Sequence, residues 1–469
     1  MPKARPHAQP PSSRPTRDPR RGAAEILLKV DSQNVPLDRA LEKYLARHRD
    51  FDLRDQRLMH ALVFGVLRYQ GQLDYFIGSF SRTPLEKMHP PVRVILRLAI
   101  FQMRFMDRIP DPAAVHTAVE LAKQLAPPWS VKFVNAVLRR AVREQHQVDF
   151  PDEAADPIQA LAVQYAYPPW MVRRWLERWG RGPTEAHLKA HNAIAPIGIR
   201  TNTLKTNTGR LADALAELCG SLSPGWFAAD HLNITAPTAA LPELKPFTQG
   251  GFQVQDEAAH LVALLCDPQP GERILDACAG LGGKTGALAQ LMTDSGSILA
   301  TDRAPWKLER LKIEMQRLGV TQVTTRKLDL TAAEAFKGES PFDRILLDAP
   351  CSGLGVIRRN PDTKWRKQPQ DILRHGEHQF RLLQCLAPHV KPGGVLTYAV
   401  CSTETEENED VIRRFLTAHQ DFKVAHDHPR LSAAALQLVD GEGFLRTQTA
   451  QHGLDGFFAV KLQRRQHYD

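Results

Sequence analysis

The feature of this sequence that most constrains its fold is an alternation of strand and helix patterns that begins at about Gly251. Short apolar runs of strand length alternate there with longer amphipathic runs whose apolar residues recur at helical spacing. Because parallel strands need crossover connections, this alternation predicts a parallel sheet that helices cover on both faces. We therefore expect a Rossmann-like domain over residues 251–465, with strands at ERILDA, SILATD, TTRKLD, DRILLDA and GVLTYAV.

The chain before this domain is helical in pattern over its first part. Between residues 22 and 146 the apolar residues recur at three-to-four spacing, with proline-containing breaks such as that at 109–112. No strand pattern intervenes in this stretch, so it predicts a compact all-helical domain. Residues 157–250 mix helical and strand-like runs and predict a small mixed α/β connector domain. The whole chain is thus expected to be multidomain, α and α/β.

Polar segments separate these domains. Residues 147–156 are polar and acidic and are interpreted as a linker. Residues 1–21 are rich in Pro, Arg, Ser and Gln, a composition that cannot bury enough apolar surface to order itself. We expect a disordered basic tail there, which is either a solvated leader or a weak phosphate-binding arm.

Charge and cysteine usage restrict the partners and the compartment. The net charge of +9 favours a polyanionic partner such as nucleic acid. The six cysteines show no paired spacing, so neither a disulfide framework nor a metal site is expected. Free thiols fit a reducing cytosol, and the N-terminal segment lacks the apolar core of a secretory signal. No apolar stretch is long enough to span a membrane, so we predict a cytoplasmic protein.

Two clusters of side chains are candidates for contact with nucleic acid. Arg139, Arg140 and Arg143 lie close together near the end of the helical domain and can form an RNA-facing surface, although a charge run is usually only a solvated face. The tryptophans of PPWMVRRWLERWG (168–180) can stack on bases. Their spacing of four or five on a helix favours core packing instead.

A glycine-rich loop follows the first expected strand of the Rossmann-like domain. The segment LDACAGLGGKTG spans residues 275–286, and Gly280, Gly282 and Gly283 allow its backbone to turn sharply and to approach a ligand. The loop lacks the GxGxxG order of dinucleotide folds and the lysine spacing of a P-loop. By itself it is compatible with NAD, a phosphate or S-adenosylmethionine.

Three acidic residues narrow that choice. Asp302, Asp329 and Asp348 end the second, third and fourth expected strands. Ligands of such sheets bind beyond the carboxyl ends of the strands, so the three carboxylates are expected to converge on one crevice. There Asp302 can accept the two hydroxyls of a ribose, and Asp329 can accept from an adenine amino group. An acid at a strand end also serves as a helix cap, but the set together favours a nucleoside cofactor.

Two cysteines are expected at the same rim of the sheet. Cys351 follows the fourth strand and Cys401 follows the fifth. Buried cysteines are usually inert small hydrophobic residues, and we interpret Cys219, Cys266 and Cys385 in that way, with Cys278 of the glycine loop also structural.

Thiols at that rim suit methylation of a pyrimidine. Cytosine C5 is a poor nucleophile, and addition of a thiolate to C6 converts it into an enamine-like carbanion that accepts a methyl group. Asp348 is placed to hydrogen-bond the N3 and amino edge of the base. After transfer the C5 proton must leave and the thiol must be eliminated, which gives a second cysteine a role. The spacing alone does not decide which of the two cysteines attacks.

These motifs resemble a known family. DAPCSG (348–353) and YAVCS (398–402), with CAGLGGK (278–284) before them, resemble the motifs of the RNA 5-methylcytosine methyltransferases. The helical domain ahead of the catalytic domain is similar to that of family members acting on small-subunit ribosomal RNA, in which it resembles the antitermination factor NusB. RTNTLK (200–205), FQVQDEAAHL (252–261) and DGFFAVKL (455–462) resemble flanking family segments. The family usually has Ala-Pro at 280–281 and Thr at 400.

The resemblance implies a specific activity and a set of site residues. It implies methyl transfer from S-adenosyl-L-methionine to C5 of an unpaired or flipped cytosine in 16S ribosomal RNA, and we expect the enzyme to be a monomer. It assigns the covalent nucleophile to Cys401 and product release to Cys351, with Asp348 beside them. The implied cofactor-binding residues are Cys278, Ala279, Gly280, Leu281, Gly282, Gly283, Lys284, Asp302, Asp329 and Asp348.

Two alternatives from other classes are weaker. A DNA cytosine-5 methyltransferase uses the same addition chemistry, but its nucleophile is the cysteine of the Pro-Cys pair, here Cys351, and it has no need of Cys401. An RNA-binding factor with an inactive methyltransferase fold would be expected to lack at least one of four residues that are all present, Asp302, Asp348, Cys351 and Cys401.

Overall fold

The computed structural model of the protein describes residues 18–48 and 51–466. Residues 1–17, most of the expected basic tail, lie outside the described residues. Residues 19–21, also assigned to that tail from the sequence, instead form the first turn of a helix. The chain divides into two compact units, the first ending at Arg173 and the second beginning at Arg174.

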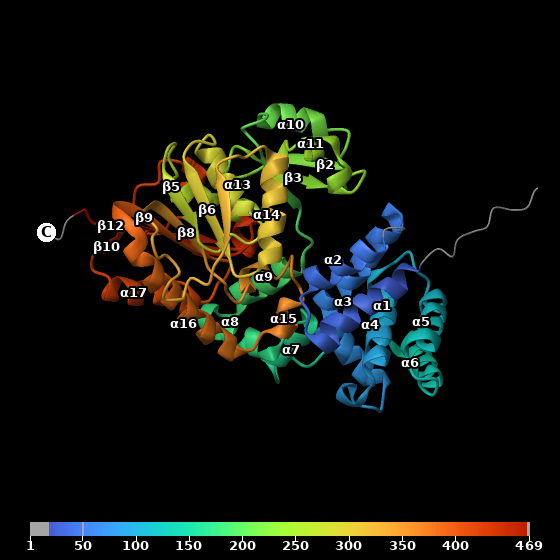
Figure 1. Ribbon diagram of the computed structural model, residues 1–469. Coiled ribbons are helices and arrows are strands. Elements are labelled where there is room, and N and C mark those ends of the chain that lie inside the picture. The colour runs from blue at the N-terminus through green and yellow to red at the C-terminus, as the bar shows by residue number, and fades with distance from the viewer. Residues whose placement is uncertain (1–17, 49–50, 467–469) are drawn as a thin grey trace, which may run out of the picture. The chain divides into compact units, whose positions relative to one another are not determined.

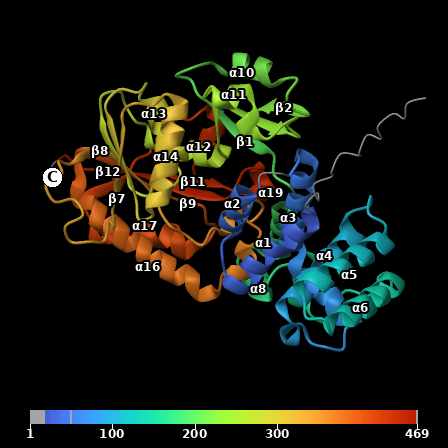
Figure 2. The same cartoon turned by 45° about the vertical axis from the view of Figure 1, so that its right-hand side comes forward.

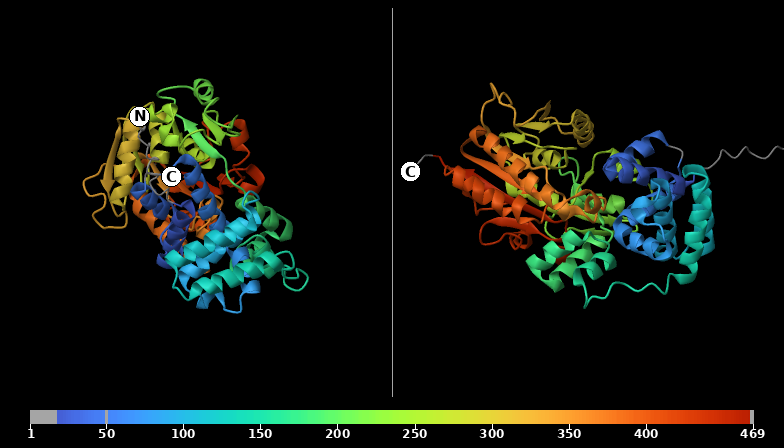
Figure 3. Two further views of the ribbon diagram at one scale, coloured as in Figure 1. Left: turned by 90° about the vertical axis from the view of Figure 1, so that its right-hand side faces the viewer. Right: turned by 90° about the horizontal axis from the view of Figure 1, so that it is seen from below.

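The described residues of the first unit form helices joined by loops, with no strand (Figure 3, blue to cyan). This confirms the all-helical domain predicted for this part of the chain. Its helices are α1 (Pro19–Gln33), α2 (Leu37–Arg47), α3 (Leu53–Phe80), η1 (Leu85–Lys87), α4 (Pro90–Phe105), α5 (Asp111–Leu125), α6 (Ser130–Glu144) and α7 (Pro157–Gln164). Aspartates cap several of them, because a carboxylate accepts the unpaired N–H groups of the first turn. Asp18 accepts from Arg20 N and Asp52 from Asp55 N. The long helix α3 packs against α1, α4 and α6.

Helix α8 (Pro169–Trp179) crosses the boundary between the units and is followed by α9 (Arg181–Asn192). Trp175 of α8 is completely buried, and its indole N–H donates to Glu404 Oε1 at 3.0 Å. Core packing, rather than base stacking, is therefore confirmed for Trp175. Helix α9 was not predicted, because its sequence RGPTEAHLKAHN has few apolar residues and opens with Gly and Pro.

A small antiparallel sheet forms the connector (Figure 2). Its strands lie in the order β2-β3-β1-β4, and their bounds are β1 (Ile197–Thr201), β2 (Ser221–Pro224), β3 (His231–Thr235) and β4 (Phe252–Val254). One face carries Ile199, Leu232 and Ile234, which pack with the helix α10 (Thr208–Leu215) in a separate small core. The short helices η2 (Leu241–Glu243) and α11 (Lys245–Thr248) complete it. Its last strand comes from beyond residue 250.

A second, larger sheet follows, in the order β10-β12-β9-β8-β5-β6-β7, with β11 paired to β12 (Figure 1). Its strands are β5 (Arg273–Asp276), β6 (Ser297–Asp302), β7 (Val323–Lys327), β8 (Phe342–Asp348), β9 (Val390–Val400), β10 (Phe422–Val424), β11 (Phe444–Thr447) and β12 (Phe457–Arg464). The five expected strands, β5 to β9, run parallel to one another, as predicted. The sheet is nevertheless mixed, because β12 runs antiparallel to β9, β10 and β11.

Helices cover both faces of this sheet, as predicted (Figures 1 and 2). One core contains α12 (Glu257–Cys266), α13 (Gly283–Leu291) and α14 (Pro305–Leu318), and the other contains α16 (Pro369–Leu386) and α17 (Glu409–Ala418). Short helical turns connect the rest: η3 (Leu354–Val356), α15 (Thr363–Arg366), η4 (Ala387–His389), η5 (Thr405–Glu407), α18 (Ala433–Leu436) and α19 (Thr449–His452). No helix within 18–48 and 51–466 is both long and apolar enough to cross a membrane.

Candidate active site

Three residues singled out in the sequence, Asp302, Asp348 and Cys401, lie at the carboxyl edge of the parallel strands, together with Asp276, which the sequence analysis did not identify. Asp276, Asp302 and Asp348 are the last residues of β5, β6 and β8. Cys401 directly follows β9, and these four strands are adjacent in the sheet. Because the strands are parallel, their carboxyl ends form one rim, where ligands of doubly wound sheets bind.

The glycine loop joins β5 to α13 and is held in shape by Asp302. Gly280 and Gly282 have φ values of +57° and +88°, in the left-handed region that favours glycine. Asp302 accepts the backbone N–H of Gly280 at 3.2 Å and that of Ala304 at 2.8 Å. Lys307 Nζ also donates to Asp302, at 3.5 Å. A carboxylate has about four acceptor sites, so Asp302 keeps capacity for at least one ribose hydroxyl.

Asp329 lies farther from the strand end than the sequence indicated. Strand β7 ends at Lys327, two residues before it. Its carboxylate accepts the backbone N–H and the hydroxyl of Thr331, which lower its pKa, and it pairs with Arg303 at 3.3 Å. The side chain is 41% exposed, against 11% for Asp302. Asp329 therefore stands at the open side of the rim and remains available to a ligand.

An ion pair occupies the centre of the rim. Lys284 Nζ donates to Asp348 Oδ2 at 2.7 Å. Burial opposes the charge on Lys284, but the carboxylate of Asp348, with a smaller contribution from Cys401, raises the lysine pKa above its usual value. Lys284 therefore keeps its charge, and it lies within electrostatic reach of the Cys401 sulfur.

A fully buried carboxyl group lies behind this pair. Asp276 accepts a hydrogen bond from the Thr285 hydroxyl at 2.7 Å, and its other oxygen, Oδ1, has no partner among the described residues. Burial, together with the charges of Asp348 and Asp302, raises the pKa of Asp276 to about 7. This concentration of carboxylates favours a ligand with a positive centre.

The residues present fit the expected nucleoside cofactor. A side chain built at Gly280 would meet no atom within 4 Å, so the loop faces open space there. Around it stand Asp302 as a ribose acceptor, the N–H groups of the glycine loop, and several carboxylates that suit a sulfonium charge. These groups fit a nucleoside with a positive centre better than a phosphate.

The two rim cysteines are in contact. The Sγ atoms of Cys351 and Cys401 are 3.2 Å apart, a thiol hydrogen bond, and neither cysteine is in a disulfide. The hydrogen bond to Cys401 and then burial raise the pKa of Cys351 well above its usual value. Cys351 therefore keeps its proton and is able to donate to the sulfur of Cys401, although either sulfur can be the donor of that bond.

A buried glutamate that sequence reasoning missed ties the two cysteine loops together. Glu407 accepts the backbone N–H of Ser352 at 2.7 Å and the hydroxyls of Ser352 and Ser402 at 2.5 Å each. These serines directly follow Cys351 and Cys401. Burial raises the pKa of Glu407, which is completely buried. The run TETEENED shows several acids after the fifth strand, but no local signal indicates that Glu404 and Glu407 are the ones that turn inward.

A second missed residue supports the glycine loop from the connector. Arg200 lies in β1, opposite Gln253 of β4, and is 1% exposed. Its guanidinium donates to Gln255 Oε1 at 2.6 Å, Gln253 Oε1 at 2.7 Å and the Gly283 carbonyl at 3.1 Å. Burial lowers its pKa to about 10. The segments RTNTLK and FQVQDEAAHL, noted from the sequence only by resemblance, thus contact the loop directly.

The remaining four cysteines are also free thiols. Cys266 is fully buried, and burial raises its pKa to about 11. Cys278 packs beside the core on the α16 side of the sheet, consistent with a structural role. Cys219 and Cys385 are only partly buried, which corrects the expectation of buried residues. No cluster of three or more His, Cys, Asp or Glu side chains suited to a metal occurs in the described part of the chain.

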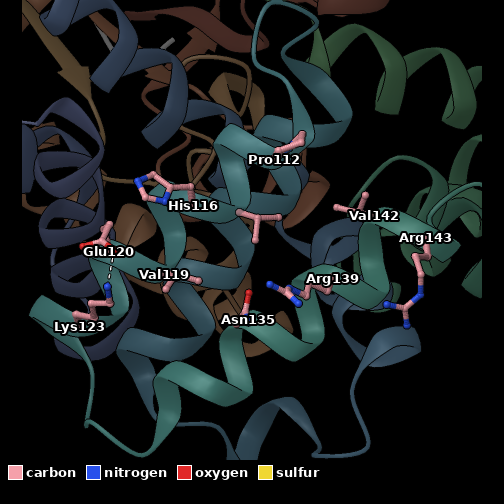
Figure 4. A pocket seen from close by; sticks show the side chains of 10 residues that line it. Pro112, His116, Val119, Glu120, Lys123, Asn135, Arg139, Val142 and Arg143 are labelled. Atoms are coloured by element: carbon pink, nitrogen blue, oxygen red, sulfur yellow. Dashed lines mark hydrogen bonds and ion pairs between the residues drawn. The ribbon is translucent and has the colours of Figure 1, made fainter.

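The helical unit contains a hollow of its own, of about 740 Å³, between α5 and α6 (Figure 4). Val115, Val119 and Val142 supply apolar lining, and Arg139 and Arg143 stand on the α6 side. In Figure 4 Glu120 pairs with Lys123, whereas Arg139 reaches into the hollow beside Asn135. Arg140 and Arg143, both expected on an RNA-facing surface, each lie within ion-pair distance of Glu144, at 2.6 Å and 3.8 Å.

Comparisons with known proteins agree with this arrangement. Residues 263–463 match the family described as 16S rRNA methyltransferase RsmB/F, residues 17–143 the NusB family, and residues 167–240 the ferredoxin-like domain of RsmF/B-like methyltransferases. A probable ribosomal RNA small subunit methyltransferase B from Synechocystis is 36% identical over 92% of this chain and 95% of its own. That of Bacillus subtilis is 35% identical over 94% and 98%.

Solved structures with a similar fold cover most of this chain. The crystal structure of PH0851 superimposes with a TM-score of 0.81 at 28% identity, covering 95% of this chain and 99% of its own. A methyltransferase homologue from Pyrococcus horikoshii gives a TM-score of 0.57 at 27% identity, over 66% of this chain and 99% of its own.

Proposed function

Because the chain belongs to the family of the ribosomal RNA small subunit methyltransferases B, which transfer methyl groups to ribosomal RNA, we propose that it methylates C5 of a cytosine in 16S ribosomal RNA through a covalent bond from Cys401. One observation carries this proposal: two free thiols in contact at the carboxyl rim, beside the Lys284–Asp348 pair. S-adenosylmethionine, when bound by the glycine loop and Asp302, supplies the methyl group that C5 accepts.

Cys401 is the attacking group. An unperturbed thiol is only about 3% thiolate at neutral pH, a deficit of about 2 kcal/mol. The Cys351 thiol can donate a hydrogen bond to the Cys401 sulfur, and the ammonium of Lys284 lies within electrostatic reach of that sulfur. Addition joins Sγ of Cys401 to C6 and moves the C5–C6 electron pair onto C5. Cys351, which keeps its proton, is unsuited to this attack.

Release of the product reverses the addition. The C5 proton passes to solvent, the bond from C6 to the Cys401 sulfur breaks, and the C5–C6 double bond forms again. The thiol of Cys351 donates a hydrogen bond to the departing sulfur and so stabilises the leaving thiolate. We therefore propose that Cys351 acts in product release.

The Lys284–Asp348 pair recognises the base. Asp348 is 31% exposed, so its carboxylate is open to accept from the cytosine amino group, and Lys284 offers a donor to the same edge. A base in a paired helix cannot reach these groups, so the target cytosine is unpaired or flipped out of its stack. We propose that a monomer acts in the cytosol, with Arg139 and Arg143 of the helical unit contacting phosphates.

Replacement of Cys401 tests the proposal. We expect Cys401→Ala to abolish methyl transfer from labelled S-adenosylmethionine to 16S ribosomal RNA prepared from cells that lack the protein, and bisulfite sequencing to map the wild-type product to one cytosine. Cofactor affinity should change less than about twofold, because the sulfur is not a cofactor ligand in this scheme. Cys385→Ala, on α16, is the matched control and should keep full activity. Methylation by Cys401→Ala would refute the assignment.

A further inference from the structure

Trp226 is a large aromatic side chain held at the surface of the connector. It lies in the loop between β2 and β3 and is 59% exposed. Its six-membered ring rests on Gly453, at the end of α19, where an added Cβ would lie only 2.2 Å from Cζ3 of the indole. Gly453 also has a φ of +69°. Both facts favour glycine there, and together they fix the indole against backbone while most of it stays open to solvent.

The loop that carries Trp226 is fastened by one buried carboxylate. Glu257 is 1% exposed and accepts three consecutive backbone N–H groups, those of Trp226 at 3.1 Å, Phe227 at 2.6 Å and Ala228 at 2.7 Å. The preceding Gly225 leaves room for it, because a Cβ there would lie 2.6 Å from Glu257 Oε1. An exposed indole on so constrained a loop loses little conformational entropy when it binds a ligand.

Polar groups of the connector sheet stand beside the indole. Ser221 pairs with Thr235 and Ser223 with Asn233 across β2 and β3, so these four side chains share one face. Ser221 Oγ and Thr235 Oγ1 are 2.6 Å apart, and Ser221, Ser223 and Thr235 are exposed. Farther along the same face His231 of β3 is fully buried. The exposed part of this polar face of the connector sheet therefore lies next to Trp226.

A cavity of about 90 Å³ joins these features, lined by Trp226, Ser223, Asn233 and the two arginines Arg358 and Arg359 among others. The arginines carry no excess charge into it, because both pair with Asp256 and Asp455. A cavity of this size holds only a few water molecules, so it accommodates the edge of a ring. Hydroxyl and amide groups without excess charge suit the polar edge of a nucleobase better than a phosphate.

We infer that Trp226 and this cavity form a subsite for one unpaired nucleotide of the substrate RNA, away from the methylated cytosine. The base stacks on the exposed indole and turns its polar edge toward Ser223 and Asn233. Base–aromatic stacking tolerates any sequence, because every base has a π-face. The inference rests on the proposed function, since it takes RNA as the substrate, but it assigns a separate contact.

Binding of single-stranded RNA to Trp226 variants tests the subsite. The probe is a fluorescein-labelled oligocytidylate of about ten nucleotides, within the site sizes usual for single-strand binding. We expect Trp226→Ala to weaken binding by about tenfold, the effect of losing one stacking contact, and Trp226→Phe to keep most of the affinity. Ile313→Ala, an exposed apolar residue on α14, is the control and should bind as the wild type does.

A spectroscopic measurement separates stacking from a purely structural role. Unlabelled oligocytidylate should quench more tryptophan fluorescence in the wild type than in Trp226→Phe. Equal quenching, or unchanged affinity in Trp226→Ala, overturns the subsite whatever the variant's melting temperature. Either result would leave Cys401-dependent methylation intact and so spare the proposed function. Loss of that methylation with normal Trp226 quenching would refute the chemistry and spare the subsite.

Discussion

At the scale of single residues, the site depends on how accurately two sulfur atoms are placed. Cys351 and Cys401 come from loops fifty residues apart, yet their Sγ atoms are in hydrogen-bonding contact. Glu407 explains this contact, because one carboxylate accepts from the serine that follows each cysteine. We therefore regard Glu407 as a positioning residue, which acts on the reaction through the cysteines.

Replacement of Glu407 by glutamine tests that role. In Glu407→Gln an NH2 group replaces one carboxylate oxygen. This group is a donor and cannot accept from the serine hydroxyls, so the loops that carry Cys351 and Cys401 are expected to separate. Misplacement of a reacting group by about 1 Å can cost about 100-fold in rate. We expect kcat to fall by that order while KM for S-adenosylmethionine changes little, since the glycine loop is untouched. Glu442→Gln, on an exposed pair with Arg413, should have no effect. An unchanged kcat in Glu407→Gln would contradict the role.

Some of these residues could be predicted from the sequence and others could not. Asp302, Asp348 and Cys401 were predicted because each directly ends or follows an apolar strand, and parallel topology brings strand ends together. Glu407 and Arg200 act through partners far away in the chain, so no local pattern marks them. Asp329 was placed at a strand end because the pattern TTRKLD does not show that β7 stops at Lys327.

At the scale of elements, the β5–α13 loop is the part of the sheet that most depends on its sequence. Gly282 caps the N-terminus of α13 with a positive φ, and a Cβ there would lie 2.7 Å from Leu311 Cγ of α14. The loop therefore has little freedom to move away from α14. Arg200 holds the other side through the Gly283 carbonyl.

A comparison of two glycine substitutions distinguishes the effect of backbone strain from an effect on the cofactor pocket. Gly271 has a φ of +85° with no atom within 4 Å of an added Cβ, so Gly271→Ala introduces backbone strain alone. We expect Gly271→Ala to lower the free energy of unfolding by about 1–2 kcal/mol without changing S-adenosylmethionine affinity. Gly282→Ala adds the clash with Leu311 and should also raise the Kd for S-adenosylmethionine about tenfold or more. Urea denaturation and calorimetric titration measure both, and equal cofactor affinities would contradict the account of the loop.

The sheet itself shows where pattern reading succeeds and where it ends. The long helices α14 and α16 connect β6 to β7 and β8 to β9, so the changes of periodicity around these strands could be detected in the sequence. The antiparallel part, β10 to β12, has only the four-residue helices α18 and α19 between its strands, and only β12 was noted, by resemblance. The same limit applies in the connector, where β2 has the polar sequence SLSP and its place in the sheet depends on pairing with β3.

At the scale of the whole molecule, the chain combines a helical unit with a catalytic unit that includes the connector. The all-helical pattern and the strand–helix alternation predicted both, because each pattern extends over more than a hundred residues. The net charge of +9 fits an RNA substrate. In our proposals the second unit supplies the chemistry, while Arg139 of the helical unit and Trp226 of the connector are separate contacts for the RNA.

The covalent bond between Cys401 and the cytosine is the central claim, and trapping that bond tests it most directly. Cys351→Ala removes the donor that stabilises the departing sulfur, so addition should proceed and release should stall. Incubated with 16S ribosomal RNA and S-adenosylmethionine, Cys351→Ala should form a protein–RNA complex that survives denaturing electrophoresis. The double variant Cys351→Ala/Cys401→Ala should form none. Continued turnover by Cys351→Ala with no such complex, or an equal complex in the double variant, would contradict the account.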